Sequence, residues 1–274
     1  MPQNGFAEQL SCNHALIEDF GLKSSGKVDS ARVLDYFQGE KVLEHYSLAA
    51  TSVGLWLSEE KVFERVFPER KSSLLELGCG CGRIASGMWE LGYVNLMATD
   101  FSRKMIERAR RMIRVLGYGI HLRVEDATRL SFDDDLFDGA IFGFNGLMQI
   151  PGRLNRVQAM SEAFRVLRRG GYFVFTSHDR DAAKWKKFWK RERMIWRKGR
   201  QKQELLEFGD RFEETDIGEL FIHVPTREEV RKDLRKVGFK VELDVLRSQL
   251  ANESLRVREF SDDCRFWIAR KPAK

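Results

Sequence analysis

The sequence lacks several features that define whole classes of proteins. No apolar run in its 274 residues approaches the roughly 18 that a membrane-spanning helix needs. The first residues, MPQNGFAEQLSCNH, have neither a basic start nor an apolar stretch, which argues against a signal peptide. Cysteine is scarce, with 4 residues, and Cys79 and Cys81 share one glycine-rich turn, which argues against a disulfide framework. These absences predict a soluble, cytoplasmic protein.

The charge is small overall but unevenly distributed. The net charge is +6, yet residues 180–202 contain eleven basic and two acidic side chains, a local net charge of +9. The rest of the chain therefore carries −3. A uniformly basic protein would suggest a nucleic-acid partner. Here the excess belongs to one segment, whose role is a separate question.

The order of apolar patterns predicts the organisation of the chain. In residues 1–70 the three- to four-residue spacing of apolar side chains indicates helices, the last ended by Pro68. From Ser72, short apolar runs alternate with helical stretches, which is typical of an α/β fold with a parallel sheet covered on both faces. The expected strands are 74–78, 95–100, 120–126, 137–144 and 171–179, and the expected helices are 83–91, 102–116 and 154–169. After an interruption at 180–222, strands at 240–246 and 264–271 are expected, and before them a helix at 226–237 that begins with a capping box of Thr226 and Glu229 and ends at Gly238.

The sharpest motif is the glycine-rich segment LLELGCGCGRIA, residues 74–85. It runs from an apolar strand through Gly78, Gly80 and Gly82 directly into a helix, and such glycines let the backbone approach a ligand closely. A dinucleotide fingerprint would need a third glycine at Arg83, so the pattern is not G-x-G-x-x-G. Glu76 precedes the turn and would favour a ligand with an ammonium group over a pyrophosphate. Asp100 ends the next strand, where it can accept hydrogen bonds from ribose hydroxyls.

These residues resemble the first motif of class I S-adenosylmethionine-dependent methyltransferases, in particular the small-molecule type (methyltransferase type 11/25-like). Four further segments resemble that family in the correct order: Asp100, Val124–Ala127, Phe137–Ile141 and Arg165–Gly171. The resemblance is close over residues 72–178 and loose over 223–274. It implies a Rossmann-like sheet of seven mostly parallel strands with the last one antiparallel.

The resemblance also implies a cofactor and a domain plan. The cofactor would be S-adenosyl-L-methionine, and the binding residues would be Glu76, Gly78, Cys79, Gly80, Gly82, Asp100, Phe101, Asp126 and Ala127. Residues 1–70 would form an N-terminal helical cap, and 71–274 the methyltransferase domain. Within it, 180–222 would be a basic, aromatic helical insertion after strand 5.

Simpler roles compete with each assigned one. Glu76 could be an ordinary polar strand residue, and Asp100 could cap the following helix, although Ser102 is better placed for that. Asp126 could only form a turn. Cys79 and Cys81 have no second Cys/His cluster nearby in sequence, so no metal site is expected.

Methyl transfer needs an aligned acceptor, and an acceptor that must lose a proton also needs a base. Asn145 and Gln149 follow strand 4 and are expected to border the acceptor. His178 follows strand 5 and could act as a base oriented by Asp179, or it could merely satisfy backbone groups at the strand end. His223 is expected to be structural, with a place in the pocket wall as the alternative.

The segment after strand 4 and the N-terminal region bear on the acceptor. Families that methylate base amines show an Asn/Asp-Pro-Pro-Tyr/Phe tetrapeptide after strand 4, whereas this chain has Asn145-Gly-Leu-Met. A small, partly apolar acceptor with a nitrogen or oxygen nucleophile is therefore expected. Tyr46 and Trp56 are candidates for a cover over the cofactor and acceptor.

Residues 184–198, KWKKFWKRERMIWRK, predict an amphipathic helix with an aromatic stripe. The stripe would pack on the domain, where the helix could serve as a lid because it follows strand 5. Alternatively, the basic residues would grip RNA phosphates while the aromatic rings stack on bases, which would make the protein an RNA methyltransferase. A membrane-surface helix is a third alternative. A non-catalytic binding protein with this fold is disfavoured by the intact motifs.

Overall fold

The computed structural model describes residues 26–274. A seven-stranded sheet has the order β3-β2-β1-β4-β5-β9-β8, and a separate two-stranded sheet pairs β6 with β7. Strands β1 to β5 are parallel to one another, while β9 runs antiparallel to both β5 and β8. The seven strands and the antiparallel last strand confirm the predicted fold class. None of the helices in the described part of the chain is long and apolar enough to cross a membrane.

The central strands of the large sheet are rich in buried apolar residues, whereas the outer strands β3 and β8 are more exposed. The strands of this sheet are β1 (Leu74–Leu77), β2 (Leu96–Asp100), β3 (His121–Val124), β4 (Phe137–Phe142), β5 (Leu167–Ser177), β8 (Lys240–Leu246) and β9 (Arg265–Arg270). The small sheet is a hairpin of β6 (Asp210–Thr215) and β7 (Gly218–His223). Because the parallel strands run in one direction, their carboxyl ends form a single edge at which loops can build a site.

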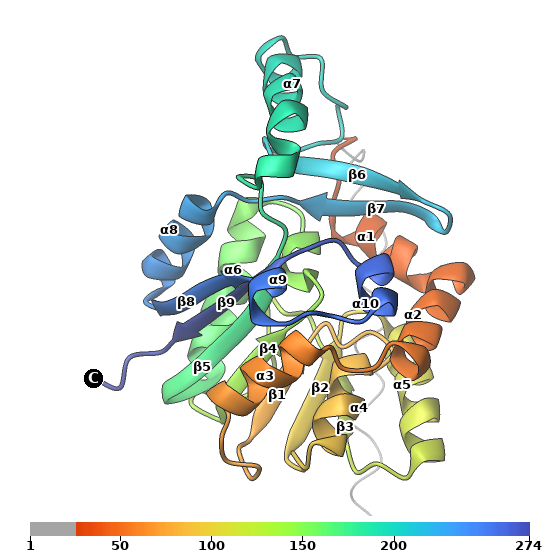
Figure 1. Cartoon of the computed structure of the whole chain (residues 1–274), viewed down its shortest axis with the longest axis vertical. Helices are drawn as coiled ribbons and strands as arrows, with labels where there is room; N and C mark the ends of the chain where they lie inside the picture. Colours follow the sequence, from red (N-terminus) through yellow and green to blue (C-terminus); the bar gives the residue numbers. More distant parts are fainter. Residues whose placement is uncertain (1–25) are drawn as a thin grey trace, which may run out of the picture.

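Helices cover both faces of the large sheet and its carboxyl edge (Figure 1). They are α1 (Ser30–Gln38), α2 (Glu40–Ser52), α3 (Leu57–Val66), α4 (Arg83–Glu90), α5 (Arg103–Leu116), α6 (Arg153–Val166), α7 (Lys186–Arg197), α8 (Arg227–Val237), α9 (Arg247–Leu250) and α10 (Leu255–Phe260). Two 3-10 turns add to them, η1 (Gly146–Gln149) and η2 (Ala183–Trp185). Several caps are as predicted. Ser102 caps α5, and Thr226 with Glu229 forms the capping box of α8, which ends at Gly238.

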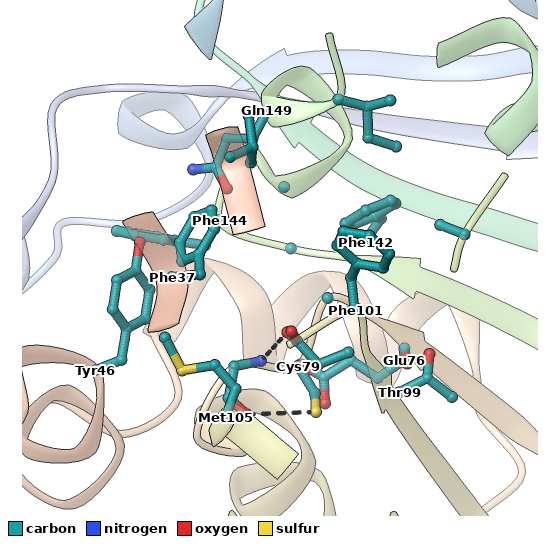
Figure 2. A pocket seen from close by; sticks show the side chains of 18 of the residues that line it. Phe37, Tyr46, Glu76, Cys79, Thr99, Phe101, Met105, Phe142, Phe144 and Gln149 are labelled. Atoms are coloured by element: carbon teal, nitrogen blue, oxygen red, sulfur yellow. Dashed lines mark hydrogen bonds between the residues drawn. The ribbon is translucent and has the colours of Figure 1, made fainter. Parts of the chain in front are cut away.

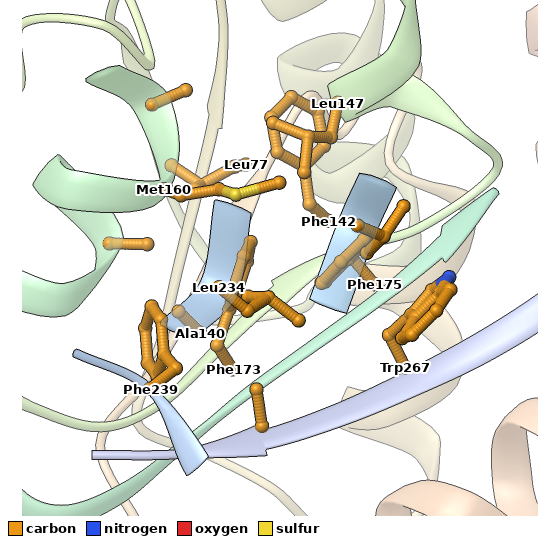
Figure 3. Packing of buried hydrophobic residues seen from close by; sticks show 14 of the residues in the cluster. Leu77, Ala140, Phe142, Leu147, Met160, Phe173, Phe175, Leu234, Phe239 and Trp267 are labelled. Atoms are coloured by element: carbon orange, nitrogen blue, oxygen red, sulfur yellow. The ribbon is translucent and has the colours of Figure 1, made fainter. Parts of the chain in front are cut away.

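Two apolar cores hold these layers together. On one face, Phe173 and Trp267 of the sheet pack with Met160 of α6 and Leu234 of α8 (Figure 3). On the other face, α3, α4 and α5 bury a second cluster that includes Phe63, Met88 and Ile106. Burial on both faces explains why the central strands β1, β4 and β5 are mostly apolar.

The largest differences from the predicted elements lie at the start of β5 and in the segment 180–222. Helix α6 ends at Val166, and not at residue 169, because buried Leu167 already pairs with Phe137 at the start of β5. The segment 180–222 is helical only in its first half: α7 is followed by the β6–β7 hairpin, which the helical interpretation missed. In Figure 1 this hairpin lies across the carboxyl edge of the large sheet, and α7 projects away from it.

Candidate functional site

A pocket lies at the carboxyl edge of strands β1 to β4. Its free space is about 1180 Å³, part of it open to solvent. Loops after these strands form its floor, and helices α1, α2 and α10 contribute its cover. Figure 2 shows the side chains that point into this space from both sides. The pocket therefore sits where an open α/β sheet binds its ligands.

The glycine-rich turn forms the part of the floor next to β1. Gly78 and Gly80 have positive φ angles, 64° and 55°, which a side chain would strain. A Cβ atom at Gly78 would lie 2.6 Å from the Phe142 ring, so only glycine fits there. Gly82 begins α4 with a φ of 90° and does not line the pocket among the described residues. Its role in this structure is to turn the chain into the helix.

Glu76 places a carboxyl group at the pocket, and one of its two oxygens has no partner in the described chain. Its side chain is 5% exposed, and no described group hydrogen-bonds to its Oε2 atom. The nearby Arg83 guanidinium is committed to Glu59 through two contacts, Nη1 to Oε2 at 2.6 Å and Nη2 to Oε1 at 2.7 Å. Burial raises the pKa of Glu76 to about 8, against the partly offsetting charge of Arg83. A cationic ligand group would supply the partner that Glu76 lacks.

Asp100 ends β2 and connects the glycine turn to the next helix. Its Oδ2 atom accepts a hydrogen bond from the Gly80 N–H and its Oδ1 atom from the Ser102 N–H, each at 2.8 Å. Burial raises the pKa of Asp100 to about 6, although these two backbone hydrogen bonds act in the opposite direction. The carboxylate lines the pocket together with Phe101, whose ring is 39% exposed there.

Asp126 and Ala127 line the pocket after β3. The Asp126 Oδ1 atom accepts hydrogen bonds from the backbone N–H and the hydroxyl of Thr128, at 2.8 and 2.7 Å. Asp126 thus forms a turn, which was the simpler of its two predicted roles, and this turn lies at the pocket wall. A second carboxylate in this loop, Glu125, also lines the pocket and was not singled out from the sequence.

The opposite end of the pocket is mainly apolar. Gln149, predicted from the sequence, lines it beside Ile150 and Pro151. Tyr46, predicted as part of the cover, also lines it, whereas Trp56 is 1% exposed in the core. Burial raises the pKa of the Tyr46 hydroxyl far above its usual value, so this group stays protonated.

The aromatic lining of this end was largely missed from the sequence. Phe37 comes from α1, Phe144 follows β4, and Phe260 ends α10. These residues are scattered over more than 220 positions of the chain. No local spacing could have indicated that their rings meet.

Asn145 and His178 do not line this pocket in the described structure, which corrects the prediction that they border the acceptor. The Asn145 Nδ2 atom lies 3.3 Å from the His178 Nε2 atom, behind the pocket wall. Asp179 does not orient His178, because its Oδ2 atom accepts hydrogen bonds from Arg265 at 2.8 and 3.1 Å. Burial lowers the pKa of His178, and the negative charge of Glu213 partly offsets this.

His178 instead lines a second cavity beneath η2 and β6, with Trp185, Arg211 and Asp262. Asn145 and the preceding Phe144 both have left-handed φ angles, 60° and 47°, which cost energy in residues other than glycine. The Asn145 N–H donates to the Thr176 hydroxyl at 2.8 Å, and this bond helps to hold the turn. His178 therefore supports a strained turn whose other residue, Phe144, forms the pocket wall.

The insertion 180–222 is fully described, and none of its residues lines the first pocket, so it is no lid over it in this structure. Its aromatic stripe packs inward: Trp189 is 7% exposed, and both Trp189 and Trp196 contact Phe208 edge to face. Only Trp185 of the stripe's tryptophans is exposed. This packing agrees with the predicted packed helix and leaves few rings free to stack on bases.

His223 is structural, as predicted, and is fully buried outside the pocket. Its Nδ1 atom lies 2.7 Å from an Asp210 oxygen, and its Nε2 atom lies 2.8 Å from a Glu229 oxygen. Cys79, Cys81 and Cys264 are free thiols, so the described cysteines form no disulfide. Burial raises the pKa of all three, which makes them unreactive.

The chain resembles characterised proteins over its central part. Residues 74–171 match the family model of a methyltransferase domain. Methyltransferase GfsG of Streptomyces halstedii is 31% identical over 114 residues, which are 41% of this chain and 40% of that protein. A demethylmenaquinone methyltransferase of Desulfitobacterium hafniense is 29% identical over 166 residues, 57% of this chain and 62% of that protein. The matches thus span less than two thirds of these relatives' length.

Solved structures share the fold over a larger part of the chain. A protein from Methanosarcina mazei described as a SAM-dependent methyltransferase has a TM-score of 0.63 at 21% identity, over 81% of this chain and all of that one. The [4+2]-cyclase SpnF has a TM-score of 0.66 at 17% identity, over 90% of this chain and 98% of that one. Because one of these folds is named a cyclase, the fold alone does not decide the reaction. Residues 74–171 match a methyltransferase domain, and the chain shares its fold with solved structures that include a protein described as a SAM-dependent methyltransferase.

Proposed function

We propose that the protein transfers a methyl group from S-adenosylmethionine to a nitrogen or oxygen atom of a small-molecule acceptor. The observation that carries this proposal is the buried carboxyl group of Glu76, whose Oε2 atom has no partner among the described residues, in the same pocket as Asp100 and the glycine turn. An α-ammonium group is the partner that such a carboxyl group requires. The matched methyltransferase domain supports the same cofactor.

The pocket residues fit this cofactor from end to end. Glu76 would hold the ammonium group, the turn at Gly78–Gly80 would let the ligand approach the backbone, and Asp100 would accept hydrogen bonds from the ribose hydroxyls. Phe101 would offer its exposed ring to the adenine, next to Asp126 and Ala127. Every residue of the predicted cofactor-binding set except Gly82 lines this pocket in the described structure.

The reaction would need little covalent chemistry from the protein. The cofactor, when bound, would supply an electrophilic methyl group on a sulfonium; the acceptor's lone pair would form the new bond to carbon, the C–S electron pair would go to sulfur, and the acceptor proton would leave to solvent. The chain would align the acceptor and exclude water, for which the apolar end of the pocket is suited. His178 lies behind the wall, so any effect it has would be exerted through Asn145.

Calorimetry on the whole chain tests the cofactor. At pH 6.5 Glu76, with a pKa of about 8, is protonated in the free protein, so binding an ammonium group should ionise it and release about one proton. Titrations of S-adenosylhomocysteine in buffers of different ionisation enthalpy measure this release. Glu76→Gln should bind more weakly and release no proton, and Asp100→Ala should bind at least tenfold more weakly. No binding by the wild type, or full affinity of Asp100→Ala, would refute the proposal.

The acceptor atom requires a separate measurement. Quinone methyltransferases are among the relatives, and one of them is named a C-methyltransferase, so carbon is the competing acceptor. Incubation with cofactor carrying a ¹³C methyl group and with phenol, amine and hydroquinone acceptors distinguishes the three by the chemical shift of the transferred methyl. Exclusive transfer to carbon would contradict the proposed nitrogen or oxygen acceptor.

A further inference from the structure

Four aromatic rings from four separate elements form a continuous surface at the apolar end of the pocket. We call Phe37, Tyr46, Phe144 and Phe260 the aromatic wall; Phe37, Tyr46 and Phe144 are seen together in Figure 2. Neighbouring ring centroids lie 5.8 Å apart for Phe37 and Tyr46, 6.1 Å for Tyr46 and Phe144, and 5.2 Å for Phe144 and Phe260. The first two pairs meet edge to face, and the last pair is stacked, so the wall offers ring faces and edges in fixed orientations.

Residues behind the wall hold these orientations. The His45 ring stacks on Phe260 at 5.3 Å, and Trp56 packs edge to face against Phe144 at 5.7 Å. The buried Arg83 guanidinium, fixed by Glu59, lies 5.9 Å from the Phe144 ring. The left-handed turn at Phe144 fixes where this ring emerges from β4. A rigid aromatic surface favours a rigid, flat partner because neither side loses much conformational freedom on contact.

The polar side chains that α2 and η1 contribute at this end, Tyr46 and Gln149, are uncharged. Tyr46 stays protonated because burial raises the pKa of its hydroxyl, and a hydrogen bond with Gln149 accompanies it. Among the described lining residues, the carboxyl groups are Glu76 in β1, Asp100 at the end of β2, and Glu125 and Asp126 in the loop after β3. A hydroxyl or carbonyl group of a ligand at the wall can pair with Tyr46 or Gln149.

We propose that the acceptor site takes a flat, uncharged aromatic molecule whose ring system lies against the aromatic wall and whose hydroxyl or carbonyl group contacts Tyr46 and Gln149. This inference rests on the proposed methyl transfer, since it assigns the wall to the acceptor. It specifies the shape and charge of the acceptor and the polar group that it carries. The aromatic wall would select for the flat ring, and Tyr46 and Gln149 would select for the polar group.

Binding of matched probes tests the proposal. Calorimetry on the whole protein, saturated with S-adenosylhomocysteine, would compare 2-naphthol with its saturated analogue decahydro-2-naphthol and with the cation trimethylanilinium. We expect 2-naphthol to bind roughly three- to tenfold more tightly than the saturated analogue, as ring–ring contacts imply. Equal or tighter binding of the saturated analogue would overturn the flat-ring inference. Tighter binding of the cation would show instead that the wall is a cation site and would overturn the proposal.

Variants distinguish the contribution of the aromatic wall from that of the hydrogen bond to Tyr46. Phe260→Leu should remove most of the preference for the flat probe, while Trp185→Leu, an exposed aromatic outside the pocket, should leave it unchanged. Tyr46→Phe keeps the ring, so it should weaken 2-naphthol by roughly fivefold and naphthalene hardly at all. An unchanged preference in Phe260→Leu would contradict the proposal. If S-adenosylhomocysteine binds but no probe does, this inference fails alone; if S-adenosylhomocysteine itself does not bind, the proposed function fails.

Discussion

Two buried polar clusters in this molecule differ in how their charges are satisfied. At the pocket, Glu76 has an oxygen that no described group hydrogen-bonds, and burial raises its pKa. Beneath the insertion, His223 lies between Asp210 and Glu229, and Glu229 also accepts a hydrogen bond from Arg180 at 2.6 Å. We call these last four residues the insertion cluster. Burial would raise the pKa of Glu229, but His223 and Arg180 lower it to about 2.

The difference shows which buried charges await a ligand. Glu207, Asp210 and His223 come close enough together to hold a metal ion. However, Glu207 is paired with Arg156 at 2.6 Å, and Asp210 and His223 are paired with each other, so their donor atoms are already used. A satisfied cluster fastens the hairpin to the core, whereas an unsatisfied carboxyl group marks a binding site.

Breaking the insertion cluster should have the largest effect on stability. His223→Ala removes the group that both carboxylates contact and leaves them buried without it. We expect a loss of about 3–5 kcal/mol in the free energy of unfolding, the usual cost of breaking a buried ion pair. Urea denaturation measures it, with His121→Ala, an exposed histidine, as the control. A loss below about 1 kcal/mol would show that the cluster does not fasten the insertion.

Replacing the carboxyl group of Glu76 by a neutral amide should have the opposite effect and increase the free energy of unfolding. In the folded protein Glu76 holds its proton up to a pH of about 8, against an ordinary pKa of 4.5, so the free energy of unfolding should fall as pH rises between these values. Glu76→Gln removes this loss and should be more stable than the wild type at pH 8.5, by on the order of 3 kcal/mol. At pH 4 the two proteins should be equally stable.

Thermal unfolding of the ligand-free proteins across pH 4 to 9 would measure this difference. Glu107→Gln, on the exposed face of α5, is the control and should follow the wild type. A parallel pH dependence of Glu76→Gln and the wild type would mean that Glu76 is not the titrating group.

His178, which supports the pocket wall from behind, should contribute less to stability. His178→Ala removes the partner of the Asn145 amide, and we expect a loss of about 1–2 kcal/mol from the unpaired buried group. His178→Gln can accept the same hydrogen bond and should recover part of it. Because His178 lies behind the wall, both variants should bind S-adenosylhomocysteine within twofold of the wild type. Equal destabilisation by both substitutions would show that the hydrogen bond to Asn145 does not matter.

The basic side chains on α7 should contribute least to stability. Replacing Lys186, Lys187, Lys190 and Arg191 by Gln changes exposed charges only, so stability should change by less than about 0.5 kcal/mol. If the helix is only a packed, solvated element, RNA affinity should be weak in both proteins. Salt-sensitive RNA binding that collapses in the variant would instead support the RNA-methyltransferase alternative.

The local motifs of the chain predicted the domain well. The order of strands and helices from 72 to 178, the capping box of α8 and the antiparallel last strand are confirmed. These features depend on contacts between residues close in sequence, or on a motif order shared with a family. The predicted cofactor residues lie around one pocket for the same reason, because strand ends of a parallel sheet meet at one edge.

The acceptor end could not be predicted in the same way. Asn145 was placed correctly after β4, but its left-handed conformation directs its amide to His178 and away from the pocket. Helices α9 and α10 were not expected between the last two strands, so Phe260 was not considered. The hairpin was missed because the whole segment 180–222 was interpreted as helical from its basic, aromatic first half. The errors at Asn145 and Phe260 concern a backbone angle that residue type does not reveal and a contact between segments that are distant in sequence.

Helix α2 gives the two ends of the pocket a common wall. Tyr46 lies against the glycine turn, with its ring 3.5 Å from the position of a Cβ atom at Gly80, and its hydroxyl belongs to the acceptor end. Any ligand that shifts this helix at one end changes the other end as well. By thermodynamic linkage, the factor by which the cofactor alters acceptor affinity equals the factor by which the acceptor alters cofactor affinity. If the two ends of the pocket hold the proposed cofactor and acceptor, helix α2 would make the binding of the two molecules interdependent.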